Sequence, residues 1–204
     1  EILIHASGKG IKFEKLNEQL PESFKDNDHA YFQYTAGVFN KYLSNLAEND
    51  IVIFSIKSTG KLLEGSKKGL LKIIRKAKDK NIKIIIFNQT PRFDTSLVGI
   101  CTNEAWFRPK SSLRKCDLKV SRSLLINKYR NISDLYESLS EKNSNVYLFD
   151  AFGIICPENM ENCSNNLQNK YIYSDASHLN KIGSDLLLKP FLNFLEVNNL
   201  LKNN

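Results

Sequence analysis

The chain has 204 residues, 42% of them hydrophobic and 25% charged, which are the proportions of a globular domain large enough to bury a core. Every apolar run falls short of the roughly 20 residues that a membrane helix needs, which argues against a membrane span. The net charge of +7 is spread along the chain without a dense basic cluster, which argues against a nucleic-acid partner.

Short apolar runs alternate with segments whose apolar residues recur at the helical period. The runs predict strands at residues 1–7, 51–54, 82–87 and 146–150. The periodic segments predict helices at residues 32–46, 70–77, 125–139 and 182–195. Residues 11–30 are expected to be polar and irregular, and 92–118 form a long irregular excursion. This alternation indicates an α/β fold with three layers, α/β/α, around a parallel sheet whose site lies at the carboxyl ends of the strands.

Residues 171–183 bring together an acid, a base and the start of a helix. Asp175 and His178 are three positions apart, and Asn180 is a favourable N-cap for the apolar-periodic segment that follows. A carboxylate at this place can accept the Nδ1–H of the imidazole and leave Nε2 free as a base. The alternative is a solvated aspartate beside a surface histidine, and the spacing alone does not decide between them.

The segment Asp175-Ala-Ser-His178-Leu-Asn resembles the last block, Asp-x-x-His-Leu-Ser/Asn, of SGNH-type (GDSL-like) esterases and acyltransferases. With the cysteines and the Gln-Thr-Pro segment at 89–91, residues 1–195 are similar to the extracytoplasmic SGNH domain fused to membrane acyltransferases of the acyltransferase 3 family. The resemblance implies a flavodoxin-like parallel sheet of the SGNH-hydrolase type. We expect residues 1–204 to form one such domain.

Four cysteines lie in the irregular excursions rather than in the strands: Cys101, Cys116, Cys156 and Cys163. Four cysteines allow three pairings, and free thiols or a zinc site are alternatives, although no Cys-x-x-Cys occurs. The resemblance implies the local disulfides Cys101–Cys116 and Cys156–Cys163. Disulfides form in oxidising compartments, in agreement with the extracytoplasmic position of the family.

SGNH enzymes carry their nucleophile in a Gly-Asp-Ser at the end of the first strand, and this tripeptide is absent from the sequence. In one interpretation the chain is clipped at its N-terminus, and Ala6-Ser7-Gly8 matches the family's second block. The strands that start at Ile2 and Ile51 then flank a gap or pair abnormally. In the other, His5-Ala-Ser7 is a degenerate first block and Ser7 is the nucleophile. We favour the first interpretation.

The resemblance also implies donors for an oxyanion hole. Gly8 corresponds to the glycine of the second block, and Ser58 stands where this subfamily often has tryptophan in place of asparagine. A serine hydroxyl can donate one hydrogen bond, although it is shorter than asparagine. The alternative for Ser58 is a solvated loop residue.

The function that the resemblance implies is transfer of an acetyl or other short acyl group to a cell-surface polysaccharide, such as lipopolysaccharide, through a Ser-His-Asp acyl-enzyme. No metal or cofactor is expected. The acyl donor would arrive through the membrane acyltransferase domain of the parent polypeptide. That domain would also tether this domain to the membrane, with this domain in the periplasm or at the cell surface. The alternatives are an inactive carbohydrate-binding or scaffold module and a stand-alone secreted esterase.

Overall fold

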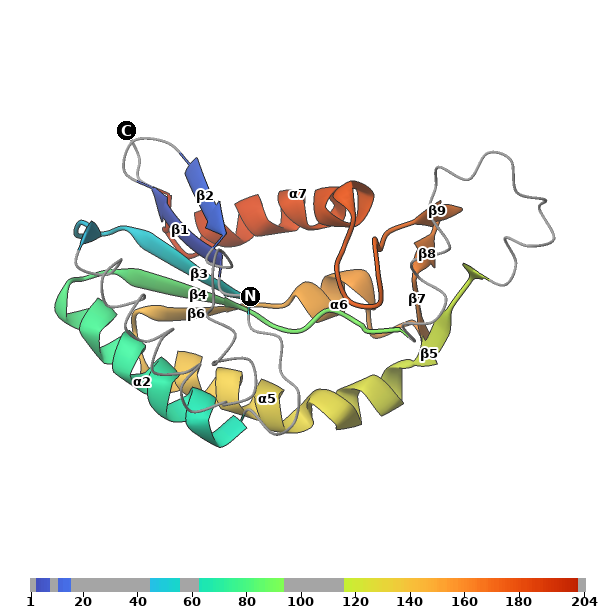
Figure 1. The fold of residues 1–204 in the computed structure, drawn as a ribbon, viewed down its shortest axis with the longest axis horizontal. Coiled ribbons are helices and arrows are strands. Elements are labelled where there is room, and N and C mark those ends of the chain that lie inside the picture. The colour runs from blue at the N-terminus through green and yellow to red at the C-terminus, as the bar shows by residue number, and fades with distance from the viewer. Residues whose placement is uncertain (1–2, 8–10, 16–44, 56–62, 94–115, 202–204) are drawn as a thin grey trace, which may run out of the picture. The chain divides into compact units, whose positions relative to one another are not determined.

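The structure is a computed structural model that describes residues 3–7, 11–15, 45–55, 63–93 and 116–201 (Figure 1). The chain divides into two compact units, and each is described by itself. The first unit comprises residues 1–88 and 131–149, and the second comprises residues 89–130 and 150–204. The expectation of a single domain over residues 1–204 stays a prediction.

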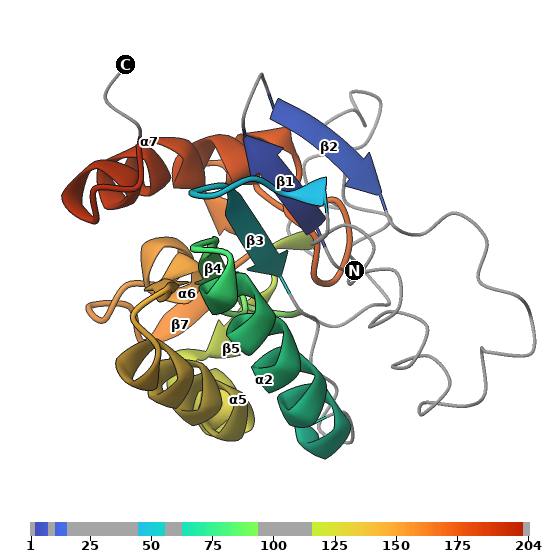
Figure 2. The ribbon, with the colours of Figure 1, turned by 90° about the vertical axis from the view of Figure 1, so that its left-hand side faces the viewer.

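A parallel sheet of three strands forms the centre of the first unit (Figures 1 and 2). Its order is β3 (Ile51–Ser55), β4 (Lys83–Phe87) and β6 (Val146–Phe149), so that β4 is the middle strand. The three strands correspond to three of the predicted apolar runs, and the α/β fold class is confirmed.

The middle strand β4 is buried on both of its faces. Side chains alternate along a strand, so Ile84 and Ile86 face one side of the sheet and Ile85 faces the other. All three side chains are 0% exposed. A continuous run of isoleucine is typical of a central parallel strand, because such a strand is covered on both sides.

Two helices lie on the same side of this sheet, α2 (Leu63–Asp79) and the part of α5 (Arg122–Lys142) that belongs to the first unit (Figures 1 and 2). Their apolar stripes are buried: Leu70, Ile74 and Ala77 on α2, and Ile132, Tyr136 and Leu139 on α5. Leu135 has the helical spacing of a buried position within the predicted helix 125–139, but it is only half-buried. The neighbouring residue Tyr136 lies in the buried face of α5 instead, and its side chain is 1% exposed.

The N-terminal region corrects part of the prediction. Residues 11–15, expected to be irregular, form strand β2 (Ile11–Lys15), which pairs antiparallel with β1 (Leu3–Ser7). Strand β1 lies beside β3, but its backbone ladder is with β2 rather than with the parallel sheet. The alternation of apolar and charged residues in Ile-Lys-Phe-Glu-Lys is typical of a strand. The pattern is only five residues long and follows a glycine loop, and we therefore expected these residues to belong to an irregular segment. The helix expected at 32–46 falls almost wholly outside the described residues.

The second unit contains several short elements that were not predicted from the sequence. In chain order they are β5 (Lys119–Ser121), α6 (Ala151–Ile155), β7 (Asn162–Ser164), β8 (Asn166–Leu167) and β9 (Lys170–Tyr171). The long helix α7 (Lys181–Val197), which was predicted, follows them. The buried cluster of this unit consists of Phe93, Ile155, Ile172 and Tyr173. Leu179, two residues before α7, and Ile182 and Leu187, in the first half of α7, pack against the cluster.

The second unit is fastened by a disulfide between Cys156 and Cys163, whose Cα atoms are 5.2 Å apart. Cys116 is also disulfide-bonded. The expected pairing of Cys101 with Cys116 stays a prediction, because Cys101 lies outside the described residues. The side chain of Arg122 donates a hydrogen bond of 3.1 Å from Nε to the carbonyl of Cys156 and lies over the ring of Phe152. These contacts tie the disulfide loop to the first turn of α5.

The predicted C-terminal helix is α7, and its buried stripe is narrower than expected. Leu195 is buried, whereas Leu186 is 41% exposed although the periodicity placed it on the buried face. In the described part of the chain, no helix combines the length and the apolar character that a bilayer crossing requires.

Substitution at the middle strand tests the packing of the first unit. We expect Ile85→Ala to lower the free energy of unfolding by about 2–5 kcal/mol, because it leaves a cavity in a fully buried site. Ile126→Ala, the same change at a side chain that is 39% exposed on α5, should alter it by less than about 0.5 kcal/mol. Urea denaturation measures both, and equal effects would contradict the burial described here.

Candidate functional site

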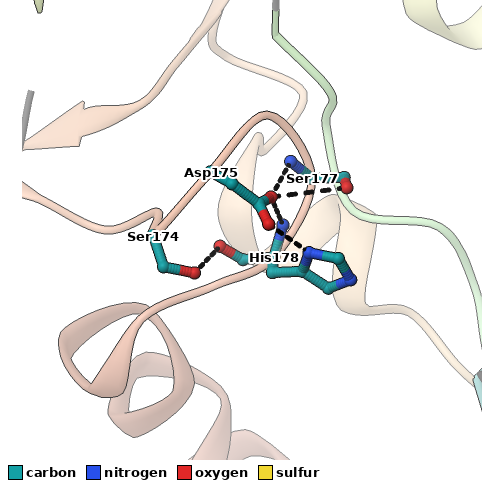
Figure 3. A network of polar contacts seen from close by, with 4 residues as sticks. All are labelled: Ser174, Asp175, Ser177 and His178. Carbon is teal, nitrogen blue, oxygen red and sulfur yellow. Dashed lines mark hydrogen bonds and ion pairs between the residues drawn. The ribbon is translucent and has the colours of Figure 1, made fainter. Parts of the chain in front are cut away.

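The candidate site is a loop that closes on itself between β9 and α7 (Figure 3). At its base, Tyr173 and Leu179 form an antiparallel bridge. The carbonyl of His178 accepts two hydrogen bonds from Ser174, one from its backbone N–H at 2.8 Å and one from its hydroxyl at 3.1 Å. The chain therefore reverses within a few residues, and the reversal presents the side chains of Asp175 and His178 together.

Both oxygens of the Asp175 carboxylate are engaged (Figure 3). Oδ1 accepts hydrogen bonds from the backbone N–H groups of Ser177 and His178, each at 2.8 Å. Oδ2 lies 2.5 Å from Nδ1 of the His178 imidazole. The contact between acid and base that the sequence spacing suggested is thus present.

The ionisation of Asp175 determines the tautomer of His178. Partial burial raises the pKa of Asp175, but the hydrogen bonds from the N–H of Ser177 and from the side chain and N–H of His178 outweigh it and lower the pKa from 3.8 to about 2. The carboxylate is therefore ionised at neutral pH and can only accept a hydrogen bond. In the neutral imidazole, Nδ1 therefore carries the proton and Nε2 holds the lone pair.

The pair is neither sequestered nor fully solvated. The side chains of Asp175 and His178 are each 50% exposed. The carboxylate holds one edge of a half-exposed imidazole. This arrangement is compatible with a general base, whose Nε2 has to reach the proton that it abstracts.

Phe93, six residues after the end of β4, contacts the loop through its backbone and through its ring. Its backbone N–H donates to the carbonyl of Ala176 at 2.9 Å, between the two residues of the pair. Its ring meets the ring of Tyr173 edge to face, with centroids 5.0 Å apart. Burial raises the pKa of the Tyr173 phenol, so that this ring stays neutral in the core.

The start of α7 is joined to the base of the loop by Asn180. Its Oδ1 accepts the backbone N–H of Gly183 at 3.0 Å, as expected for an N-cap. Its backbone N–H donates to the carbonyl of Ile172 at 3.0 Å. Gly183 permits this close approach, because a Cβ at that position would lie 2.2 Å from the same carbonyl oxygen.

The hairpin that leads into the loop is held by a buried asparagine, Asn165, which is 2% exposed. Its Nδ2 donates to the carbonyl of Cys116 and its Oδ1 accepts the N–H of Leu118, each at 2.9 Å. The carbonyl of Asn165 accepts the N–H of Ile172. Sequence reasoning missed Asn165 and Phe93, because their partners are distant in the chain and no local pattern identifies them.

Several residues that we proposed for the site cannot be placed. Gly8 and Ser58, the expected oxyanion donors, lie outside the described residues. Ser7 is the last residue of β1, but its side chain belongs to the part of the chain that is not described. The roles of these three residues, and the catalytic roles of Asp175 and His178, stay predictions. In the described parts of the chain, no three or more histidine, cysteine, aspartate or glutamate side chains cluster as a metal site.

Comparison with known families decides the family of this chain. The model for the family described as "SGNH domain (fused to AT3 domains)" matches residues 14–193, which is most of the chain. The chain belongs to this family. An SGNH domain is of the acyl-transferring or ester-cleaving type, and the Asp175–His178 pair lies within the matched residues.

The other comparisons add little. A solved structure, that of the periplasmic domain of a lipopolysaccharide acetyltransferase from Salmonella ser. Paratyphi A, matches with 16% sequence identity and a TM-score of 0.40. The match covers 71% of this chain and 55% of that domain. The comparison with curated proteins found no match.

The low pKa of Asp175 predicts how the site responds to acid. Because its folded pKa lies below the unfolded value of 3.8, the stabilisation it provides is complete above that value and is lost as the pH falls towards about 2. The side-chain carboxyl resonance followed by NMR should therefore titrate near pH 2. In His178→Ala the midpoint should move upward, because one of the hydrogen bonds that lower it is removed. A wild-type midpoint at or above 3.8 would contradict the described geometry.

Two glycines offer a matched test of the loop's close packing. Gly183→Ala forces a Cβ against the backbone carbonyl of Ile172, so we expect the protein to lose about 1–3 kcal/mol of stability. At Gly153 the equivalent Cβ meets Oδ2 of Asp150 at 2.1 Å, and a side chain can rotate away. Gly153→Ala should therefore be nearly neutral, because the cap it disturbs and the helix propensity it gains are each worth about 1 kcal/mol. Thermal unfolding distinguishes the two, and a larger effect at Gly153 would argue against this packing.

Proposed function

We propose that this domain catalyses acyl transfer through a Ser-His-Asp acyl-enzyme, in which Asp175 and His178 are the acid–base half. The observation that carries the proposal is the contact between Oδ2 of Asp175 and Nδ1 of His178. The ionised carboxylate orients the imidazole, and the unprotonated Nε2 is the base.

The nucleophile is proposed to be a serine outside these 204 residues, in the Gly-Asp-Ser block that the sequence lacks. Nε2 of His178 accepts the proton of this serine hydroxyl as the oxygen attacks the carbonyl carbon of the acyl donor. The imidazolium that forms is stabilised by Asp175. It then gives its proton to the leaving group as the tetrahedral intermediate collapses to the acyl-enzyme.

The second half of the reaction repeats the first with a different nucleophile. An acceptor hydroxyl loses its proton to Nε2, attacks the acyl-enzyme and releases the serine, which recovers its proton from the imidazolium. We propose that the N–H of Gly8 and the hydroxyl of Ser58 donate to the oxyanion in both steps. Such donors are worth about 2.7–4 kcal/mol each in comparable sites.

The substrate is proposed to be an acetyl or similar short acyl group, and the acceptor a hydroxyl of a cell-surface polysaccharide such as lipopolysaccharide. The support is the family itself, whose description names the fusion of this domain to AT3 domains. Such a fusion would deliver the acyl donor through the membrane and place the domain in the periplasm or on the cell surface. The Cys156–Cys163 disulfide fits that compartment, because disulfides persist where the environment is oxidising.

A second candidate is a carbohydrate-binding or scaffold module without catalysis. The observation in its favour is the absence of Gly-Asp-Ser from the sequence. The two candidates differ in whether the full-length polypeptide contains a serine whose replacement abolishes acyl transfer.

The test uses the full-length polypeptide with acetyl transfer to purified polysaccharide and hydrolysis of an aryl acetate as the two assays. We expect His178→Ala to lower both activities at least about a thousand-fold, because the serine is then left protonated. Asp175→Asn should lower them on the order of a hundred- to ten-thousand-fold, since it stabilises the wrong imidazole tautomer.

Val197→Ala, at a side chain that is 71% exposed at the far end of α7, is the control and should leave both activities unchanged. Circular dichroism verifies that each variant is folded. Full activity in folded His178→Ala would rule out the mechanism. Inactivity of the wild-type protein in both assays, together with retained polysaccharide binding, would favour the binding module.

A further inference from the structure

We propose that the side-chain amide of Asn180 is a positioning group for the acid–base pair, beyond its role as the N-cap of α7. The inference rests on the proposed function of Asp175 and His178. Asn180 is only two residues after His178, and its side chain contacts both the base of the loop and the first turn of the helix.

The two ends of the Asn180 amide have different partners. Oδ1 accepts the N–H of Gly183 at 3.0 Å, which is the cap. Nδ2 donates to the carbonyl of Tyr171 at 2.8 Å and makes a longer contact of 3.5 Å to the carbonyl of Tyr173. The partners require this assignment of oxygen and nitrogen, because an N–H needs an acceptor and a carbonyl needs a donor.

These contacts close the loop that carries the pair. Tyr171 and Tyr173 lie where the chain enters the loop, and Asn180 lies where it leaves. The amide therefore holds the entry strand and the exit helix at a fixed separation, while the bridge between Tyr173 and Leu179 aligns them. Asp175 and His178 are half-exposed, so their orientation depends on the loop's frame more than on packing around their own side chains.

Capping and positioning can be separated by substitution. Serine and aspartate are both good N-caps, so either would keep the acceptor for the N–H of Gly183. Serine removes the Nδ2 donor, and aspartate replaces it with an oxygen that faces two carbonyl oxygens. If Asn180 were only a cap, aspartate would be as good as asparagine or better, because it also complements the helix dipole. If the amide positions the loop, aspartate is the worst of the three.

Asn198 provides a matched control at the other end of the same helix. Its Nδ2 donates to the carbonyl of Phe194 at 2.8 Å, and its side chain is partly buried like that of Asn180. Asn198→Ser therefore removes a comparable side-chain-to-backbone hydrogen bond from α7 without affecting the loop. It should leave kcat unchanged.

The experiment measures kcat and KM for aryl acetate hydrolysis by the full-length protein and its variants. We expect Asn180→Ser to lower kcat roughly ten- to a hundred-fold, because a small misplacement of a catalytic group has effects of this size. KM should stay within about two-fold, since the amide is not proposed to touch the substrate. Asn180→Asp should lower kcat further than Asn180→Ser.

The pH profile supplies a second readout that a loss of stability alone would not move. In Asn180→Ser the imidazole is held less closely against Asp175, so its protonated form loses stabilisation. The pH at which kcat falls to half on the acid side should therefore shift downward relative to wild type. The same midpoint should not move in Asn198→Ser.

The proposal is overturned if Asn180→Asp is as active as wild type, or if Asn180→Ser lowers kcat no more than Asn198→Ser does. Should Asn180→Asp fail to fold, the comparison of the two serine variants decides alone. The result is separable from the proposed function by His178→Ala. An active His178→Ala refutes the proposed function, whereas an inactive His178→Ala with a fully active Asn180→Ser refutes only the inference about Asn180.

Discussion

The carboxylate of Asp175 has two oxygens, and the loop uses them for different purposes. One oxygen accepts the N–H groups of Ser177 and His178 and thereby shapes the backbone. The other holds the imidazole. Because one ionised group satisfies both, the conformation of the loop and the tautomer of its histidine are coupled. Protonation of Asp175 weakens both sets of contacts at once.

The coupled pair depends in turn on a small apolar cluster. Phe93 and Tyr173 pack edge to face, and Leu179 joins them from the end of the loop. The backbone N–H of Phe93 also donates to the loop between Asp175 and His178. The burial of these rings stabilises the frame, and the hydrogen bonds select one conformation within it. Burial of the rings and the hydrogen bonds are both needed to keep the half-exposed side chains of Asp175 and His178 in contact.

The sequence predicted what depends on local pattern. The isoleucines of β4, the periodicity of α5 and the cap at Asn180 all carry their signal within a few residues. The antiparallel strand β2 and the short strands β7, β8 and β9 were missed, because a pattern of two to five residues is too short to identify a strand before its pairing partner is known. Within the site, the spacing of Asp175 and His178 allowed their contact but did not by itself distinguish it from a solvated aspartate beside a surface histidine. The buried amide of Asn165 acts between segments far apart in the chain and has no local signature.

The contacts that define the acid–base pair join residues 175, 177 and 178, within four consecutive positions. A functional unit this compact can be inherited as one short piece of sequence. Substitutions in the strands and helices can accumulate without altering it, provided that the loop keeps its two ends together. Divergence in the surrounding segments can therefore change which molecules a domain of this kind meets, while the means of moving a proton stays the same.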